Sequence, residues 1–175
     1  MLEAEIWGIA ETGDGYMIFI KPLKSEYSVP IFIGQLEAQA ILIGFGGVSI
    51  SRPLTADLLQ NLIKEAHFEL IRIEINDLKD NTFFGAIVLK NAVGGELVID
   101  SRPSDALALA VRCKSPIFVD EKVVAKAGIL TDGLTAVKEE AAKRSLLQKE
   151  LEEAVAVENY ERAAEIRDIL KSLEQ

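Results

Sequence analysis

The stretch Asp100-Ser101-Arg102-Pro103-Ser104-Asp105-Ala106-Leu107 follows an apolar strand-like segment and runs into an apolar helical one. A similar phrase occurs earlier in the chain, as Ser51-Arg52-Pro53-Leu54-Thr55-Ala56-Asp57-Leu58. Proline is favoured in the first helical turn, Ser and Thr cap its free N–H groups, and Asp suits the positive end of the helix dipole. Both phrases are therefore predicted to begin helices.

The same phrases also predict a site. An arginine beside the free N–H groups of a helix can hold a phosphate, and a neighbouring carboxylate can orient it or bind a metal ion. This interpretation makes Arg52 and Arg102 substrate ligands, and it makes Asp57, Asp100 and Asp105 catalytic. The simpler interpretation is two capped helix starts, each with an Arg–Asp pair. The catalytic interpretation requires the two phrases to meet in one cleft.

The rest of the pattern predicts an α+β fold, with a mixed, mostly antiparallel sheet and three or four helices. Strands are expected at Leu2–Ala10, Tyr16–Ile20, Tyr27–Ile33, Phe68–Leu78, Thr82–Lys90, Glu96–Ile99 and Ser115–Val119. Helices are expected after Gly34, over Thr55–Ala66 and Ser104–Arg112, with a helical turn near Glu121–Ala127. Pro30 indicates an edge or a bulge in its strand.

A boundary is predicted near Gly133, with one domain over residues 1–130 and a helical tail over 134–175. The tail contains no Gly or Pro and is rich in Glu, Lys, Ala and Leu. Helices over Leu134–Ala156 and Tyr160–Leu173, joined at Glu158-Asn159, would form an antiparallel hairpin at about 147–173. Such a hairpin buries little by itself, so we expect it to dock on the first domain, a second copy or a partner.

Composition narrows the cellular setting. The chain has 175 residues, of which 49% are hydrophobic, and no apolar run reaches the roughly 18 residues that a membrane span needs. The acidic N-terminus lacks the layout of a signal peptide, and the single cysteine excludes an intramolecular disulfide framework. We expect a cytoplasmic protein without a membrane anchor.

Net charge restricts the partners. The formal charge is −9, and both parts are acidic: residues 1–133 carry 12 Lys and Arg against 18 Asp and Glu, and residues 134–175 carry 7 against 10. Proteins that grip nucleic acid through its phosphates usually present a basic face. Nucleic acid remains an expected substrate, but tight, non-specific binding is disfavoured.

The sequence offers few residues for other kinds of catalysis. The one histidine, His67, stands at a helix end, where a cap or surface role is the simpler interpretation. Cys113 is predicted to be structural, although Arg112 and Lys114 beside it could lower its pKa. Gly44-Phe45-Gly46-Gly47 lacks the P-loop and dinucleotide patterns and is predicted to end a helix. Carboxylate-plus-arginine chemistry remains.

Three phrases in residues 2–126 resemble the bifunctional nuclease domain family. They are Ile33-Gly34-Gln35-Leu36-Glu37-Ala38-Gln39-Ala40-Ile41, the Arg52–Leu58 phrase, and Ile99-Asp100-Ser101-Arg102-Pro103-Ser104-Asp105-Ala106-Leu107-Ala108. The resemblance implies DNase and RNase activity and gives functional weight to Arg52, Asp57, Asp100, Arg102 and Asp105. The family phrase commonly has a histidine where this chain has Ala56.

The tail resembles the UVR motif of bacterial nucleotide-excision-repair subunits and some protease regulators. The matching residues are Tyr160-Glu161-Arg162-Ala163-Ala164-Glu165-Ile166-Arg167-Asp168-Ile169. The resemblance implies a protein-docking hairpin that binds a repair or protease-complex subunit. Its expected docking residues are Tyr160, Ala163, Ala164, Arg167 and Asp168.

The leading hypothesis is a nuclease that hydrolyses phosphodiester bonds in DNA or RNA, with Mg²⁺ or Mn²⁺ held by Asp57 and Asp105. Its main rival is a non-catalytic adaptor or stress and repair regulator that binds proteins through the tail. A third alternative is a small-ligand sensor that binds an anion at the arginine sites. We also expect a homodimer, because several sheet edges need cover.

Overall fold

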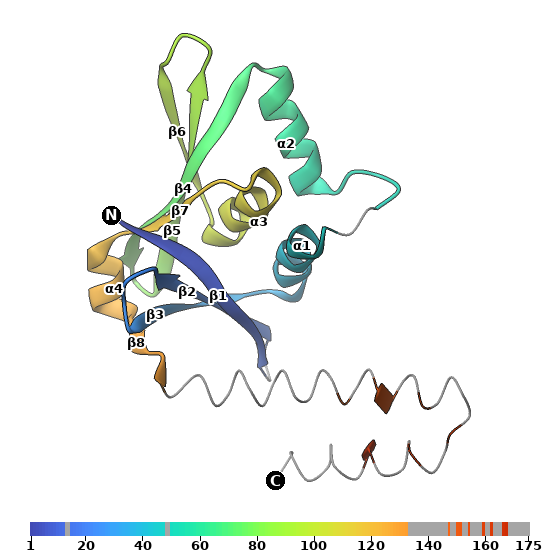
Figure 1. Cartoon of the computed structure of the whole chain (residues 1–175). Helices are drawn as coiled ribbons and strands as arrows, with labels where there is room; N and C mark the ends of the chain where they lie inside the picture. Colours follow the sequence, from blue (N-terminus) through green and yellow to red (C-terminus); the bar gives the residue numbers. More distant parts are fainter. Residues whose placement is uncertain are drawn as a thin grey trace. The chain divides into compact units, whose positions relative to one another are not determined.

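The computed structural model describes residues 1–12, 15–47 and 50–132, together with positions 147, 150, 151, 154, 159, 162, 166 and 167. The chain divides into two compact units, Met1–Leu130 and Thr131–Gln175. The elements of the first unit are labelled in Figure 1: β1 (Leu2–Thr12), β2 (Gly15–Pro22), β3 (Tyr27–Ile33), α1 (Gln35–Gly46), α2 (Thr55–Glu65), β4 (Phe68–Lys79), β5 (Thr82–Asn91), β6 (Glu96–Ser101), α3 (Pro103–Cys113), β7 (Ile117–Val119), α4 (Glu121–Ala127) and β8 (Ile129–Leu130).

The described strands form one mixed sheet in the order β6-β5-β4-β7-β1-β2-β3-β8. Only the pairing of β4 with β7 is parallel among these neighbours, so the predicted α+β class with a mostly antiparallel sheet is confirmed. The short strand β8 was not predicted, because two residues are too few to show a period. It pairs with Tyr27 and Ser28 only. Beyond them the described strands leave one side of β3 open, which accommodates Pro30.

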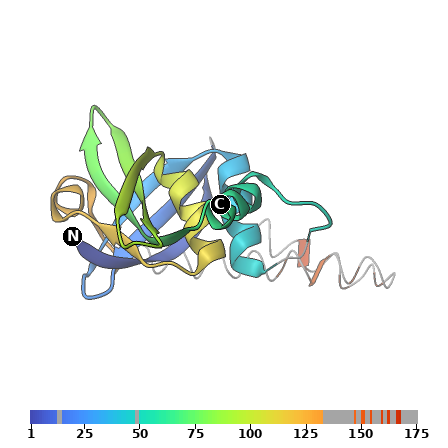
Figure 2. The same cartoon turned by 90° about the horizontal axis from the view of Figure 1, so that it is seen from above.

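Helix α3 lies at the centre of the helical layer. Five consecutive residues of this helix, Ala106 to Ala110, are buried. The small alanines among them allow close contact, and both α1 and α2 pack against α3 while α3 itself covers β4 and β5. Figure 2 shows α3 in the middle of this arrangement. The fourth helix, α4, packs against β3 and β4 and contributes Val123 to the same core.

Both predicted helix starts exist, but their caps differ from the prediction. The N-cap residues are Leu54 for α2 and Arg102 for α3, and neither helix has a side-chain cap from Ser or Thr. Helix α2 begins at Thr55, as expected, and α3 begins at Pro103, one residue earlier than expected, so Thr55 and Ser104 are helical residues of the first turn and not N-caps. The prediction that these hydroxyl groups cap the helices is therefore wrong.

Positions 147, 150, 151, 154, 162, 166 and 167 of the C-terminal unit are helical. Ala154 and Ile166 are buried in one cluster with Leu147 and Leu151. Asn159 lies between them, and its side chain accepts a hydrogen bond from the backbone N–H of Arg162 at 3.2 Å, as an N-cap does. Among the predicted docking residues Arg167 is exposed, whereas Tyr160, Ala163, Ala164 and Asp168 lie outside the described residues. In the described part of the chain, no helix is long and apolar enough to cross a membrane.

Candidate functional site

Helix α3 carries an arginine at each end, and each arginine forms an ion pair with one or two carboxylates. Arg102 is the N-cap and Arg112 lies in the last turn. The three carboxylates that these arginines contact are Glu37, Asp57 and Asp105, and each is the third residue of its helix. An acid at this position is favoured by the helix dipole. The same local feature, an acidic residue at the third position of a helix, therefore occurs three times, and two arginines of α3 pair with these three carboxylates.

The Arg112 end of α3 is a buried hydrogen-bond network. The Arg112 side chain is only 6% exposed, and its Nε donates to Asp57 Oδ1 at 2.5 Å. Its Nη1 donates to the carbonyl oxygens of Ala40 at 2.9 Å and of Ala108 at 2.8 Å. The side chain of Gln60 donates to the Arg112 carbonyl oxygen at 3.4 Å. Arg112 thus joins α1, α2 and α3 at one point.

Asp57 is held in its ionised form. The hydrogen bond from Arg112 lowers the pKa of the Asp57 carboxyl below its ordinary value, against burial, which raises it. The backbone N–H of Leu54 also donates to Asp57 Oδ2 at 2.8 Å and lowers this pKa further. At neutral pH the Asp57 carboxylate is therefore a fixed negative charge beside a fixed positive one.

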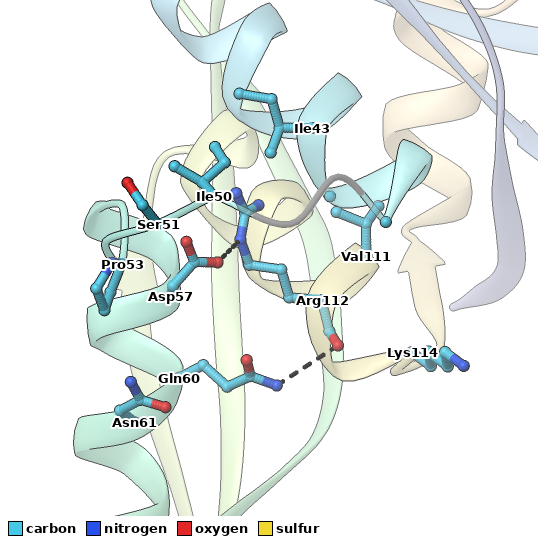
Figure 3. A pocket seen from close by; sticks show the side chains of 12 residues that line it. Ile43, Ile50, Ser51, Pro53, Asp57, Gln60, Asn61, Val111, Arg112 and Lys114 are labelled. Carbon is cyan, nitrogen blue, oxygen red and sulfur yellow. Dashed lines mark hydrogen bonds and ion pairs between the residues drawn. The ribbon is translucent and has the colours of Figure 1, made fainter.

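This pair lines a cavity of about 590 Å³, here named the Arg112 cavity (Figure 3). Its polar wall consists of Ser51, Asp57, Gln60, Asn61, Arg112 and Lys114, and apolar residues such as Ile50 and Val111 complete it. Figure 3 shows the guanidinium of Arg112 between Asp57 and Ile50. A cavity of this size, with apolar walls and a few convergent polar groups, is typical of a small-ligand site.

The other end of α3 is more open. Arg102 donates to Asp105 through Nε at 2.7 Å and Nη2 at 3.0 Å, and to Glu37 through Nη1 at 3.0 Å. The Arg102 side chain is 65% exposed. With Glu37, Ser104, Asn81, Thr82 and Phe83 it lines a separate cavity of about 310 Å³, here named the Arg102 cavity. This pair matches the simpler interpretation, an arginine neutralised by the aspartate of its own phrase.

The two phrases do not meet, so the expectation of one common cleft is wrong. The two cavities share no lining residue. Arg102 and Arg112 are ten positions apart on one helix, which corresponds to about 15 Å along its axis. Asp57 and Asp105 therefore lie beside different arginines, at opposite ends of α3. Asp105 pairs with Arg102 of its own phrase, whereas Asp57 pairs with Arg112, which belongs to neither phrase.

Two predicted site residues stand apart from both cavities. Arg52 is exposed in the segment before α2, and Asp100 is exposed on β6 opposite Ala86. Within the described part of the chain, neither side chain makes a hydrogen bond or an ion pair, and neither lines one of the two cavities. The described residues also contain no group of three or more His, Cys, Asp or Glu side chains that could hold a metal ion.

The remaining reactive side chains behave as structural ones. Burial raises the pKa of the Cys113 thiol, against a hydrogen bond from Gln60 and the charges of Lys64 and Arg112, so the thiol is protonated at neutral pH. His67 is exposed after α2 with a φ of 60°. Ala56, at the position where the family phrase commonly has histidine, packs against the hydrophobic core.

Arg112 is the functional candidate that sequence reasoning missed. In the sequence Arg112 stands out only as a neighbour of Cys113. Its partners lie 55 residues away at Asp57 and 72 residues away at Ala40. The local signal was a lone arginine that ends an apolar helix, and such a residue usually interacts with the helix dipole. The number of its partners became visible only when α1 and α2 were placed beside α3.

Comparison with known families agrees with this picture of an α+β domain with arginine–carboxylate sites. A model of the bifunctional nuclease domain matches residues 18–132, and a model of the UvrB/uvrC motif matches residues 142–175. The chain belongs to the bifunctional nuclease domain family, and the predicted resemblance to this family and to the UVR motif is confirmed.

Relatives extend the comparison. An uncharacterized protein of Mycobacterium tuberculosis is 34% identical over 134 residues, which cover 73% of this chain and 79% of the relative. Bifunctional nuclease 2 of Arabidopsis thaliana is 26% identical over 166 residues, which cover 81% of this chain and 50% of the plant protein. Bifunctional nuclease 1 of the same plant is 24% identical over 165 residues, with 81% and 51% covered. The chain spans about half the length of these plant proteins.

Proposed function

We propose that this protein hydrolyses phosphodiester bonds in DNA or RNA at the Arg112 cavity. The observation that carries the proposal is the ionised Asp57 carboxylate on the wall of a nucleotide-sized cavity, in a chain of the bifunctional nuclease domain family. In this reaction a water oxygen adds to phosphorus and one ester P–O bond breaks. The water proton goes to the departing oxygen. Asp57 orients the water, and the cationic wall offsets the charge that develops on phosphate.

A divalent ion is part of this proposal. Both Asp57 oxygens already accept one hydrogen bond each, but a carboxylate has capacity for about four. Mg²⁺ or Mn²⁺ needs only one or two carboxylates when waters and substrate oxygens complete its shell. Asp57 and the side-chain oxygen of Asn61 would hold it here. When bound, the ion would supply positive charge for the phosphate oxygens.

The test is a cleavage assay with purified full-length protein on single-stranded DNA and RNA, with Mg²⁺, with Mn²⁺ and with a chelator. We expect cleavage with metal, and we expect Asp57→Asn to lose most of it. Glu65→Gln, at the end of the same helix and exposed, is the matched control. Equal activity of wild type and Asp57→Asn would reject Asp57 as the catalytic group. Loss in Asp105→Ala instead would move the site to the Arg102 cavity.

The match of residues 142–175 to the UvrB/uvrC motif favours a second candidate, a non-catalytic adaptor or regulator. The formal charge of −9 and the neutralisation of Asp57 and Asp105 by arginines also support it. In this role the tail would bind a repair or protease-complex subunit. A binding assay with such a subunit should lose affinity in Arg167→Glu, whose side chain is exposed, while cleavage is absent. Unchanged binding would reject this role for the residue.

Self-association is proposed on two elements of the first unit. Helix α2 contains no buried residue and exposes Leu58, Leu59 and Leu62. The outermost strand β6 exposes Leu97, Val98 and Ile99 and offers unpaired backbone groups along its free edge. Sedimentation equilibrium of the full chain should therefore give a dimer mass. A monomer mass at all concentrations would contradict this expectation.

A further inference from the structure

The Arg112 cavity contains a polar group that the fold leaves unsatisfied. Nη2 of Arg112 is buried and has no hydrogen-bond partner, although Nε and Nη1 of the same guanidinium both donate hydrogen bonds. Buried polar groups in native proteins are nearly always paired, so an orphan donor on a charged side chain needs an explanation such as a bound ion or ligand. Arg112 itself lines the Arg112 cavity, from which a ligand can bring the missing acceptor to this buried nitrogen.

The surroundings of this nitrogen are rich in donors. Lys114 lines the cavity just after α3, is exposed, and has no ion pair with any described residue. The N-terminus of α2 borders the cavity through Pro53 and Asp57. The Asp57 side chain accepts from the N–H of Leu54, and Leu54 offers no side-chain cap for the N–H groups that follow in this eleven-residue helix. Donors from two helix ends thus face one space.

We infer that the Arg112 cavity binds a phosphate group through Arg112 Nη2, the Lys114 ammonium and the first turn of α2. This inference rests on the proposed function, since it concerns the same cavity, but it requires no catalysis. A phosphate offers several acceptor oxygens, which suits a planar guanidinium donor and a helix start. The carboxylate of Asp57 remains on Nε and offsets one positive charge, so the affinity is modest.

The space around Lys114 admits more than an isolated anion. A second cavity of about 620 Å³ also borders Lys114 and includes Phe45 and Pro116 in its wall. Phe45 is exposed, and an aromatic side chain is a surface on which a base can stack. The phosphate can therefore come as free phosphate or as the phosphate of a nucleotide, and both sources use the same donors.

The test uses full-length protein in a chelator, with inorganic phosphate, thymidine 5′-monophosphate and thymidine as probes. Calorimetry gives affinity, and NMR of the arginine side-chain N–H groups reports on Arg112. Both phosphate-bearing probes should shift the Arg112 signals, whereas thymidine should not. Tighter binding of the nucleotide than of phosphate would identify the nucleotide as the fitting source, and equal binding would identify the free anion.

Two variants distinguish phosphate binding at the Arg112 cavity from non-specific attraction of phosphate to surface lysines. Lys114→Gln, an exposed change that should not disturb folding, is expected to weaken phosphate binding about tenfold, as for one charge-assisted hydrogen bond. Lys24→Gln, in the turn between β2 and β3, is the matched control. No shift of the Arg112 signals, or equal loss in both variants, would overturn the inference. Because no turnover is measured, a protein that binds phosphate without cutting nucleic acid would reject only the nuclease proposal.

Discussion

The two ends of helix α3 use the same chemistry in different surroundings. At one end Arg112, 6% exposed, bonds to Asp57 and to two backbone carbonyl oxygens from α1 and α3. At the other end Arg102, 65% exposed, bonds to Asp105 and Glu37 only. In the first case the arginine connects three helices from a buried position. In the second case the arginine links α3 to α1 from an exposed position.

The difference in burial between Arg112 and Arg102 allows two sites that look equivalent in the sequence to be ranked. Exposed ion pairs contribute little because water and salt screen them, whereas removal of one partner from a buried pair leaves an unpaired charge in a low-dielectric place. The phrase at Arg102 therefore has the weaker energetic role. The phrase at Asp57 depends on an arginine from elsewhere and has the stronger one.

The largest effect is expected for Arg112→Gln. This change removes the charge partner of Asp57 and the donors to the carbonyl oxygens of Ala40 and Ala108. We expect a loss of about 3 kcal/mol in the free energy of unfolding, the range for breaking a mostly buried pair. Urea unfolding followed by circular dichroism measures it. Arg112→Lys, which keeps the charge without the planar fork, should recover only part of the loss. A change below about 0.5 kcal/mol, typical of surface substitutions, would break the comparison.

A somewhat smaller effect is expected for Gly44→Ala, because Gly44 lets α1 approach the Arg112 end of α3. A Cβ there would lie 2.5 Å from Val111 Cγ2 and 2.9 Å from Arg112 Nη1. Neither neighbour yields easily, since Val111 is β-branched and Nη1 is held by two hydrogen bonds. Overpacking lowers the free energy of unfolding, and the better helix propensity of alanine offsets part of that effect. We therefore expect a net loss of about 1–2 kcal/mol in the free energy of unfolding. Gln39→Ala, exposed on the same helix, should show almost none.

These two positions also show how far sequence reasoning reaches. Hydrophobic periodicity predicts the three long helices and the α+β class, and three sequence phrases carry the resemblance to the family, because each of these features is local in the sequence. The stretch Gly44–Gly47 is predicted to end a helix, and α1 does end at Gly46 with Gly47 as a left-handed C-cap, but the contact of Gly44 with α3 is not visible in that pattern. Arg112 was missed for the same reason: the identity of its partners depends on packing between segments distant in sequence. Local patterns found the carboxylates, and only packing decided which arginine each of them met.

A further prediction concerns acid pH and Asp57. The pKa of Asp57 is lowered in the folded state, so its pair contributes stability above the unfolded pKa, near 3.9, and loses it as pH falls through the lower folded value. Asp57→Asn should reduce the free energy of unfolding by about 1 kcal/mol at pH 7, less than a fully buried pair because the side chain is 33% exposed. The difference from wild type should shrink as the pH is lowered from 5 toward 2, in urea titrations at each pH. A pH-independent difference would contradict the assignment.

The smallest effect is expected for Arg102→Gln. Its partners Asp105 and Glu37 are solvent-accessible, and Arg102 itself is the more exposed of the two arginines of α3. Exposed pairs are worth about 0.2–1 kcal/mol each and are screened by salt. We therefore expect a loss below about 1 kcal/mol that nearly vanishes in 1 M NaCl, whereas the loss in Arg112→Gln persists there. If both losses respond equally to salt, then burial does not separate the two ends of α3, and the Arg112 cavity has no special claim as the functional site.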